Sequence, residues 1–151
     1  MAVPDMELAV EKDVFVAASP GVVFDYFTKP ELLTRWQADE ADVDVRPGGH
    51  LVWRLSPENV ARGEYVAVEP PHRVVFTFGW EGNQGVPPGS STVEVTLEPE
   101  GDGTRVRLRH TDLPDDDARV NHGVGWAHYL ARLEIAATGA DPGPNSFTRP
   151  E

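Results

Sequence analysis

Two histidines in the last third of this 151-residue chain are the side chains best suited to chemistry. His110 ends a stretch in which Val106 and Leu108 share its side of a two-residue alternation, and His122 lies in the predicted helix that follows. Because imidazole titrates near neutral pH, either side chain could orient a ligand or act as an acid or base. The alternative, which we favour, is a hydrogen-bonded histidine of the core, and we assign no catalytic residue.

Other kinds of reactive site lack the residues that they need. Cysteine is absent, which excludes thiol catalysis, disulfides and Cys-ligated zinc. His122 and His128 would lie about 120° apart around a helix, and no His-Glu-x-x-His motif is present, so we predict no metal site. No serine occupies a nucleophile elbow, and Pro47-Gly48-Gly49 leads into a predicted strand as a turn does. We therefore predict no cofactor and a non-enzymatic role.

Aromatic side chains recur at predicted inward-facing positions. Val74, Phe76, Phe78 and Trp80 form the clearest two-residue alternation, which is typical of a half-buried strand. Such side chains either fill a core or line an apolar pocket that has a few polar groups, and both interpretations stay open. The candidate ligand-binding residues are Trp36, Trp53, Phe76, Phe78, Trp80, His110, His122, Trp126, Tyr129 and Leu133.

A small set of secondary-structure elements must position these side chains. Residues 8–16 are predicted to form a first strand, and Ser19-Pro20 begins a helix with serine as its N-cap and proline in its first turn. Pro30 begins a second short helix that runs through Trp36. Through the middle of the chain the hydrophobic period is two, which predicts an antiparallel meander, and one long helix follows it.

The long helix has two apolar sides. At 100° per residue, the side predicted to face inward falls within an arc of about 100°; it carries His122, Trp126, Tyr129, Leu130, Leu133 and Ala137. Nearly opposite lies a second stripe of Val120, Val124, Ala127, Ala131 and Ile135, where the surface helix of a monomer should be polar. Either this stripe packs beneath the chain's own loops and short helices, or it forms a homodimer through Val120, Val124, Ala131 and Ile135.

The charge of the chain limits its partners. The 25 acidic and 13 basic residues give a net charge of −12, which opposes binding to nucleic acid or to anionic membranes. No apolar run approaches the roughly 18 residues of a membrane span, and Met1–Glu11 lacks the pattern of a signal peptide. We expect a cytoplasmic protein without nucleic-acid or membrane partners.

The chain length corresponds to one domain. We predict an N-terminal extension at residues 1–7 and a single domain at residues 8–138. Residues 139–151 contain several prolines and few apolar residues, which predicts a flexible tail.

Particular residues resemble one family in an ordered combination. The matching motifs are Ser19-Pro20, Trp36, Arg46-Pro-Gly-Gly49, Gly63-Glu-Tyr65, Val68-Glu-Pro-Pro71, Thr104 through His110, and His122 with Gly125-Trp126. This family is named after the activator of heat-shock protein 90 ATPase and belongs to the START/Bet v 1-like (SRPBCC) superfamily. The resemblance spans residues 8–137 and implies an α+β helix-grip fold. In that fold a curved antiparallel sheet of about six or seven strands wraps around a long C-terminal helix, and two short helices follow the first strand.

The resemblance implies a cavity between the sheet and the long helix. We therefore predict non-enzymatic binding of a small hydrophobic ligand in that internal cavity. The family name suggests an alternative, a chaperone or another protein partner bound through the surface. A third possibility is a cyclase- or hydrolase-type enzyme, because relatives in the wider superfamily do chemistry in this cavity. It requires two or more polar groups that converge in the pocket.

Overall fold

Seven strands and three helices make up the part of the chain that the computed structural model describes, residues 9–143. In chain order they are β1 (Val10–Val16), α1 (Pro20–Thr28), α2 (Pro30–Leu33), β2 (Glu40–Val43), β3 (His50–Ser56), β4 (Asn59–Glu69), β5 (Arg73–Phe78), β6 (Ser91–Glu100), β7 (Gly103–Thr111) and α3 (Asp116–Ala136). The predicted α+β order of strand, short helices, meander and long helix is confirmed.

The two short helices begin where their capping residues predict. The Ser19 side chain accepts a hydrogen bond at 3.4 Å from the backbone N–H three residues later, and Pro20 lies in the first turn of α1. The helix α2 is shorter than predicted, because it ends at Leu33 and Trp36 lies in the turn beyond it. There the Trp36 indole N–H donates to the Tyr26 carbonyl at 2.8 Å, which ties this turn to α1.

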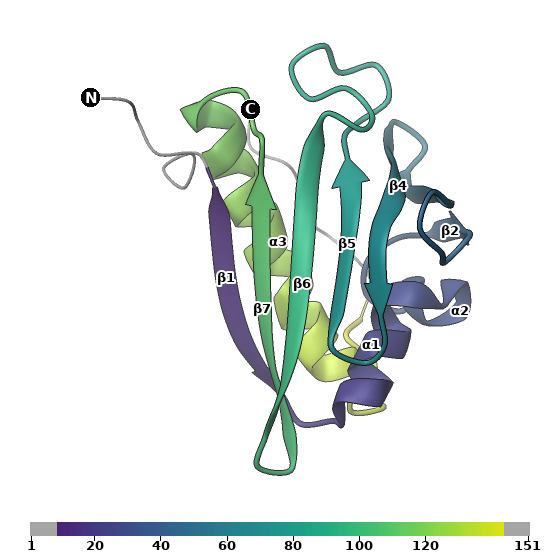
Figure 1. Ribbon diagram of the computed structural model, residues 1–151, viewed down its shortest axis with the longest axis vertical. Helices are drawn as coiled ribbons and strands as arrows, with labels where there is room; N and C mark the ends of the chain where they lie inside the picture. Colours follow the sequence, from purple (N-terminus) through teal and green to yellow (C-terminus); the bar gives the residue numbers. More distant parts are fainter. Residues whose placement is uncertain (1–8, 144–151) are drawn as a thin grey trace.

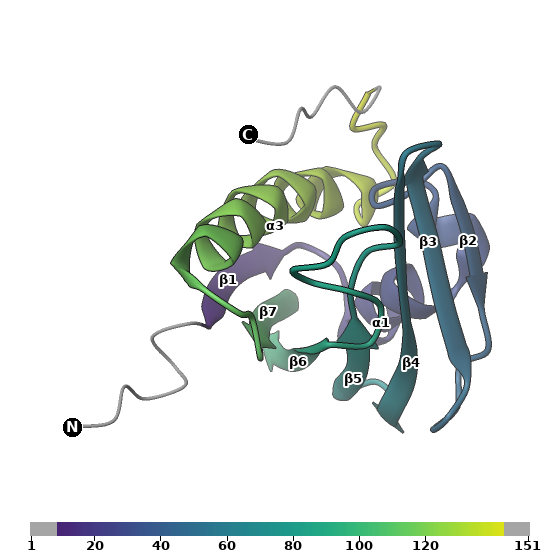
Figure 2. The same ribbon diagram turned by 90° about the horizontal axis from the view of Figure 1, so that it is seen from above.

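All seven strands belong to one antiparallel sheet in the order β1-β7-β6-β5-β4-β3-β2. The last strand therefore pairs with the first, and Val10 lies opposite His110. Figure 1 shows β1 and β2 at opposite sides of the molecule, and Figure 2 shows the sheet curving so that α3 lies along its concave side. This arrangement is the predicted helix-grip fold, and it leaves the space between sheet and α3 as the place for a pocket.

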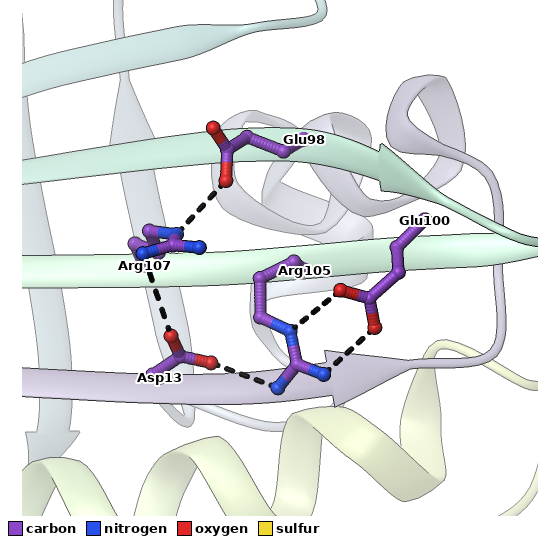
Figure 3. Close-up of polar contacts among 5 residues, drawn as sticks. All are labelled: Asp13, Glu98, Glu100, Arg105 and Arg107. Carbon is purple, nitrogen blue, oxygen red and sulfur yellow. Dashed lines mark hydrogen bonds and ion pairs between the residues drawn. The ribbon is translucent and has the colours of Figure 1, made fainter.

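The outer face of the sheet carries a row of paired charges (Figure 3). Asp13 of β1 lies between Arg105 and Arg107 of β7, at oxygen–nitrogen distances of 2.8 and 3.9 Å. Glu100 and Glu98 contact the same two guanidinium groups at 2.7 and 2.8 Å. The hydrogen bond from Arg105 lowers the pKa of the Glu100 carboxyl. Because these arginines are already neutralised by carboxylates, the row is not a basic surface for phosphates.

An acidic cap begins α3. The Asp115 side chain accepts a hydrogen bond from the Ala118 N–H at 2.8 Å, and Asp116 and Asp117 occupy the first turn, where carboxylates interact favourably with the helix dipole. None of the helices within residues 9–143 is both long and apolar enough to span a membrane.

The two apolar sides of α3 have different surroundings. The inward side is buried at Trp126, Tyr129, Leu130, Leu133 and Ala136. The opposite stripe is exposed: Val120, Val124 and Ile135 keep 46, 44 and 43% of their surface accessible, and Ala127 and Ala131 are also exposed. The described loops and short helices of the chain therefore do not cover the stripe.

The predicted extension at residues 1–7 lies outside the described residues, as do residues 144–151 of the predicted tail. The described part of that tail, residues 139–143, follows α3 and lies beside it. The Arg132 side chain donates to the Gly143 carbonyl at 2.9 Å and to the Trp36 carbonyl at 3.1 Å. Arg132 thus links the tail, α3 and the turn after α2.

Candidate functional site

A pocket of about 250 Å³ opens between α3 and the sheet. It is bounded by α3, by the end of β5, by the β3–β4 turn and by the segment that follows α2. The lining residues are Gln37, Asp39, Leu55, Ser56, Asn59, Phe78, Trp80, Asn121, His122, Gly125, Trp126 and Tyr129.

One side of the pocket is aromatic. The ring of Phe78, at the end of β5, has its centre 5.3 Å from the ring of Trp80 and 6.0 Å from that of Trp126. Trp126 and Tyr129 lie three residues apart and so share one side of α3. The end of β5 with the residues just after it, and the middle of α3, therefore each supply two large rings.

The rim of the pocket is polar. Asp39 is exposed, and it is the one acidic or basic residue other than His122 in the described lining. Asn59 donates its side-chain N–H to Ser56 Oγ at 2.9 Å across the β3–β4 turn. Gln37 is only 3% exposed, and its Oε1 atom has no hydrogen-bond partner among the described residues. The pocket thus combines an aromatic wall with a rim of amide, hydroxyl and carboxylate groups.

His122 connects the two sides of the pocket. Its Nδ1 lies 2.7 Å from the Ala118 carbonyl, which can only accept, so Nδ1 carries the ring proton. Its Nε2 accepts a hydrogen bond from the Trp80 indole N–H at 2.9 Å. The ring is therefore a neutral imidazole with both nitrogens hydrogen-bonded to protein groups.

His110 lies beneath the pocket and is fully buried. Its Nδ1 accepts from the Trp126 indole N–H at 3.1 Å. Its Nε2 is 2.8 Å from Ser91 Oγ, and that hydroxyl donates its own proton to the Phe78 carbonyl at 2.6 Å. The proton of His110 must therefore sit on Nε2 and point to Ser91.

Burial lowers the pKa of His110 well below its ordinary value, and the nearby His122 imidazole lowers it further, because a proton on either ring opposes a proton on the other. The two imidazole rings lie 5.0 Å apart, at nearly a right angle. Because His110 is neutral, is bonded at both nitrogens and does not line the pocket, it cannot reach a ligand there. Its bonds join β5, β6, β7 and α3, which is a structural role.

The pocket brings together half of the predicted site residues. Those that line it are Phe78, Trp80, His122, Trp126 and Tyr129. Trp36, Trp53, Phe76, His110 and Leu133 are buried but do not line it. Trp53 Nε1 and Tyr65 Oη also lack a hydrogen-bond partner among the described residues, and burial raises the pKa of Tyr65.

Sequence reasoning missed the polar rim and Gly125. Gly125 could have been predicted as a site residue, because a glycine inside an amphipathic helix lowers helix stability and therefore indicates a packing or functional role. Gln37 and Asp39 carried none, since turn residues have no hydrophobic period. Within residues 9–143, no group of three or more histidine, aspartate or glutamate side chains is placed to hold a metal.

Comparison with known proteins identifies the family. Residues 17–138 match the family described as "Activator of Hsp90 ATPase homolog 1-like protein" (AHSA1). The chain belongs to this family. No curated protein matches the chain.

Solved structures of the AHSA1 family and of similar proteins share the fold. An AHSA1-like protein from Rhizobium etli is 43% identical, with a TM-score of 0.74 and coverage of 95% of this chain and 89% of that chain. CalU16 from Micromonospora echinospora is 31% identical, with a TM-score of 0.74 and coverage of 90% and 69%. The Aha1 dimer from Colwellia psychrerythraea is 17% identical, with a TM-score of 0.76 and coverage of 85% and 95%, and at that identity it shows the fold alone.

Proposed function

We propose that this AHSA1-like protein binds a small, largely apolar molecule in the pocket beside α3, and that it acts in the cytoplasm as a binding protein rather than an enzyme. The aromatic wall supports apolar contact, and the few polar groups of the rim support orientation of the ligand. The single observation that carries the proposal is the open space at Gly125.

Gly125 lies in the interior of α3, where glycine costs about 1 kcal/mol of helix stability relative to alanine. A Cβ atom added at Gly125 would meet nothing within 4 Å, so close packing does not require glycine there. Gly125 lines the pocket, and the space beside it is therefore pocket space. A residue that lowers helix stability while keeping a pocket open supports a role in binding.

The histidine geometry supports binding over catalysis. His122 is the one histidine in the described lining, and both of its ring nitrogens already have protein partners. It can act as an acid or base only after one of those bonds breaks. An enzyme would convert its ligand, so recovery of the bound molecule unchanged, checked by mass spectrometry, separates the two functions.

The test is to fill the pocket from Gly125. We expect Gly125→Leu to abolish binding of 2-naphthol, a two-ring probe, in isothermal titration calorimetry, because the new side chain occupies the pocket. Gly123→Ala is the control on the same helix: its added Cβ would lie 4.0 Å from Val10 Cγ1 and outside the pocket lining. Equal affinity of Gly125→Leu and the wild type for the probe would contradict the proposed site.

We also propose that the exposed stripe of α3 pairs with the α3 of a second copy. The stripe is symmetric about the Ala127–His128 bond, so an antiparallel copy would place Val120 against Ile135 and Val124 against Ala131. A two-fold dimer uses one patch on both subunits in this way. The dimer formed by Aha1 from Colwellia psychrerythraea supports this proposal. The family name supports the alternative of a chaperone or another protein partner bound through the surface.

A further inference from the structure

We propose that His122 is a positioning residue of the pocket: it holds Trp80 in the aromatic wall only while its imidazole is neutral, so that protonation of His122 weakens ligand binding. The inference rests on the proposed binding function and adds a dependence on pH to it. It does not require the imidazole to contact the ligand, because His122 acts through Trp80.

Two hydrogen bonds select one protonation state of the His122 ring. Its Nδ1 lies 2.7 Å from the Ala118 carbonyl, one turn earlier on α3, and its Nε2 lies 2.9 Å from the indole nitrogen of Trp80. A carbonyl can only accept, and an indole N–H can only donate. The neutral ring with its proton on Nδ1 is therefore the one state that suits both partners.

A second proton on His122 would disrupt the contact with Trp80. It would occupy Nε2 and face the indole N–H, so that two donors would meet across 2.9 Å. Trp80 is only 9% exposed, and an N–H that loses its acceptor in such a place costs free energy. The Trp80 ring, packed edge-on against Phe78 with the ring centres 5.3 Å apart, would have to move. Both rings line the pocket, so the movement would change its wall.

The neighbouring His110 directs the proton to His122. The two rings lie 5.0 Å apart, so a proton on one opposes a proton on the other. His110 is fully buried, and this burial, together with the nearby His122, lowers its pKa well below the ordinary value. His122 is half-buried and borders the pocket. Since imidazoles titrate near neutral pH, mild acid should therefore act on His122 before it acts on His110.

On the pocket side, the groups around His122 do not oppose a positive charge. The described lining contains no lysine or arginine; besides His122, its titratable groups are the Asp39 carboxylate and the Tyr129 phenol. The Asp39 carboxylate, on the segment after α2, is of the sign that favours a proton on His122. The β3–β4 turn contributes the carboxylate of Glu58, which accepts from Ser56 Oγ at 3.4 Å.

On the side of the helix, the nearest basic group is already neutralised. Arg119 lies three residues before His122 on α3, and its guanidinium pairs with Asp116 at 2.7 Å. The first strand, β1, brings the apolar side chain of Val10 to the neighbouring turn of α3. Apart from His110, none of these groups would repel a proton on His122.

The test is isothermal titration calorimetry of 2-naphthol at pH 7.5, 6.5 and 5.5. This phenol stays neutral across the range, so its own charge does not change. We expect the wild type to lose about tenfold in affinity from pH 7.5 to pH 5.5, the effect of one hydrogen bond. His122→Gln can still accept from Trp80 but cannot be protonated, so its affinity should stay within about twofold. His72→Gln, at the exposed turn between β4 and β5, should keep the profile of the wild type.

A measurement on the wild type without ligand gives a second test. The indole N–H signals of Trp80 and Trp126 can be followed by NMR over the same pH range, with Trp80→Phe to assign the first. The Trp80 signal should shift as its acceptor His122 takes up a proton, whereas the Trp126 signal, whose acceptor His110 stays neutral, should not. A Trp80 signal that does not move would overturn the inference, even if His122→Gln fails to fold.

Failure of the inference and failure of the proposed function give different results. If 2-naphthol binds the wild type equally at all three pH values, the pocket binds ligands but the role of His122 is overturned. A loss of affinity in acid that persists in His122→Gln would assign the pH dependence to another group and would also overturn it. If 2-naphthol binds at none of the pH values, the proposed function fails, and this inference fails with it.

Discussion

The two histidines near the pocket satisfy two buried indoles. A buried tryptophan N–H needs an acceptor, and a neutral imidazole supplies one nitrogen while its other nitrogen donates. His122 accepts from Trp80 on Nε2, and His110 accepts from Trp126 on Nδ1, so the two rings adopt opposite tautomers. Protonating either ring would place two N–H groups against each other. The imidazoles are therefore suited to holding the aromatic wall in place.

The buried state of His110 predicts acid sensitivity. Its pKa is lowered in the folded protein, so below the ordinary value of 6.5 the unfolded chain binds a proton that the folded chain does not. The contribution of His110 to stability is therefore unaffected well above pH 6.5 and falls as the pH drops below it; between pH 7 and pH 5 the loss is at most about 2 kcal/mol, the value for an imidazole that stays neutral in the folded protein. Urea unfolding at pH 7, 6 and 5 measures the loss.

We expect His110→Gln to be less stable than the wild type at pH 7, because it disrupts the bonds to Ser91 and Trp126, but to lose less stability on acidification. The stability gap between the two proteins should narrow from pH 7 to pH 5, by at most about 2 kcal/mol. His72→Gln, at an exposed turn between β4 and β5, is the matched control. A gap that stays constant across this pH range would contradict a neutral, buried His110.

The surface of the helix α3 has three regions with different surroundings. One side closes the core, the middle of that side borders the pocket at Gly125, and the opposite stripe is exposed. Helix propensity is lowered at two interior glycines, Gly123 and Gly125. Packing leaves room for a Cβ at both, since neither has an atom closer than 4.0 Å to that position.

Gly125→Ala should therefore stabilise the protein by about 0.5–1 kcal/mol, because alanine restores helix propensity without a clash. Gly123→Ala should give a gain of similar size, and thermal or urea unfolding of both variants checks the pair. Only Gly125→Ala should also weaken binding of 2-naphthol, since only that methyl group enters the pocket. A destabilised Gly125→Ala protein would mean that the space beside Gly125 is not open.

The same elements show what sequence could and could not predict. The capping residues Ser19 and Pro20, the two-residue period of the strands and the family resemblance predicted the order of elements, because these signals are local. The predicted end of α2 was wrong, because Trp36 lies beyond the helix and donates its indole N–H to the Tyr26 carbonyl. This tertiary contact has no local signal in the sequence.

The pocket was predictable only where it coincides with a periodic element. Phe76 and Phe78 belong to one alternation on β5, yet Phe76 is in the core and Phe78 lines the pocket. That difference depends on which part of β5 lies under the aromatic side of α3, and the period of a strand does not contain it. The rim residues Gln37 and Asn59 come from turns far apart in the chain, and only the folded sheet brings them to one pocket.

The molecule as a whole is acidic, yet it exposes an apolar stripe on α3. The net charge of −12 and the paired arginines of the outer sheet face oppose nucleic acid. The stripe of α3 offers apolar contact in a surface otherwise suited to repelling like-charged proteins. A second copy can use the stripe only if the apolar contact outweighs that repulsion, so dimerisation should strengthen with added salt, which screens the charges.

We expect the wild type to be a dimer of the 16.6 kDa chain, measured as about twice that mass by multi-angle light scattering. Val124→Glu should dissociate it to monomers, because a carboxylate in the centre of the stripe would be buried without a partner in both subunits. Val66→Glu is the matched control, since Val66 is an equally large exposed residue on β4, away from α3. If the wild type is monomeric at tens of micromolar, the self-pairing is refuted and the stripe becomes a surface for a different protein. If both variants dissociate the dimer, the interface lies outside the stripe, and the negative charge added by either glutamate is the cause of dissociation.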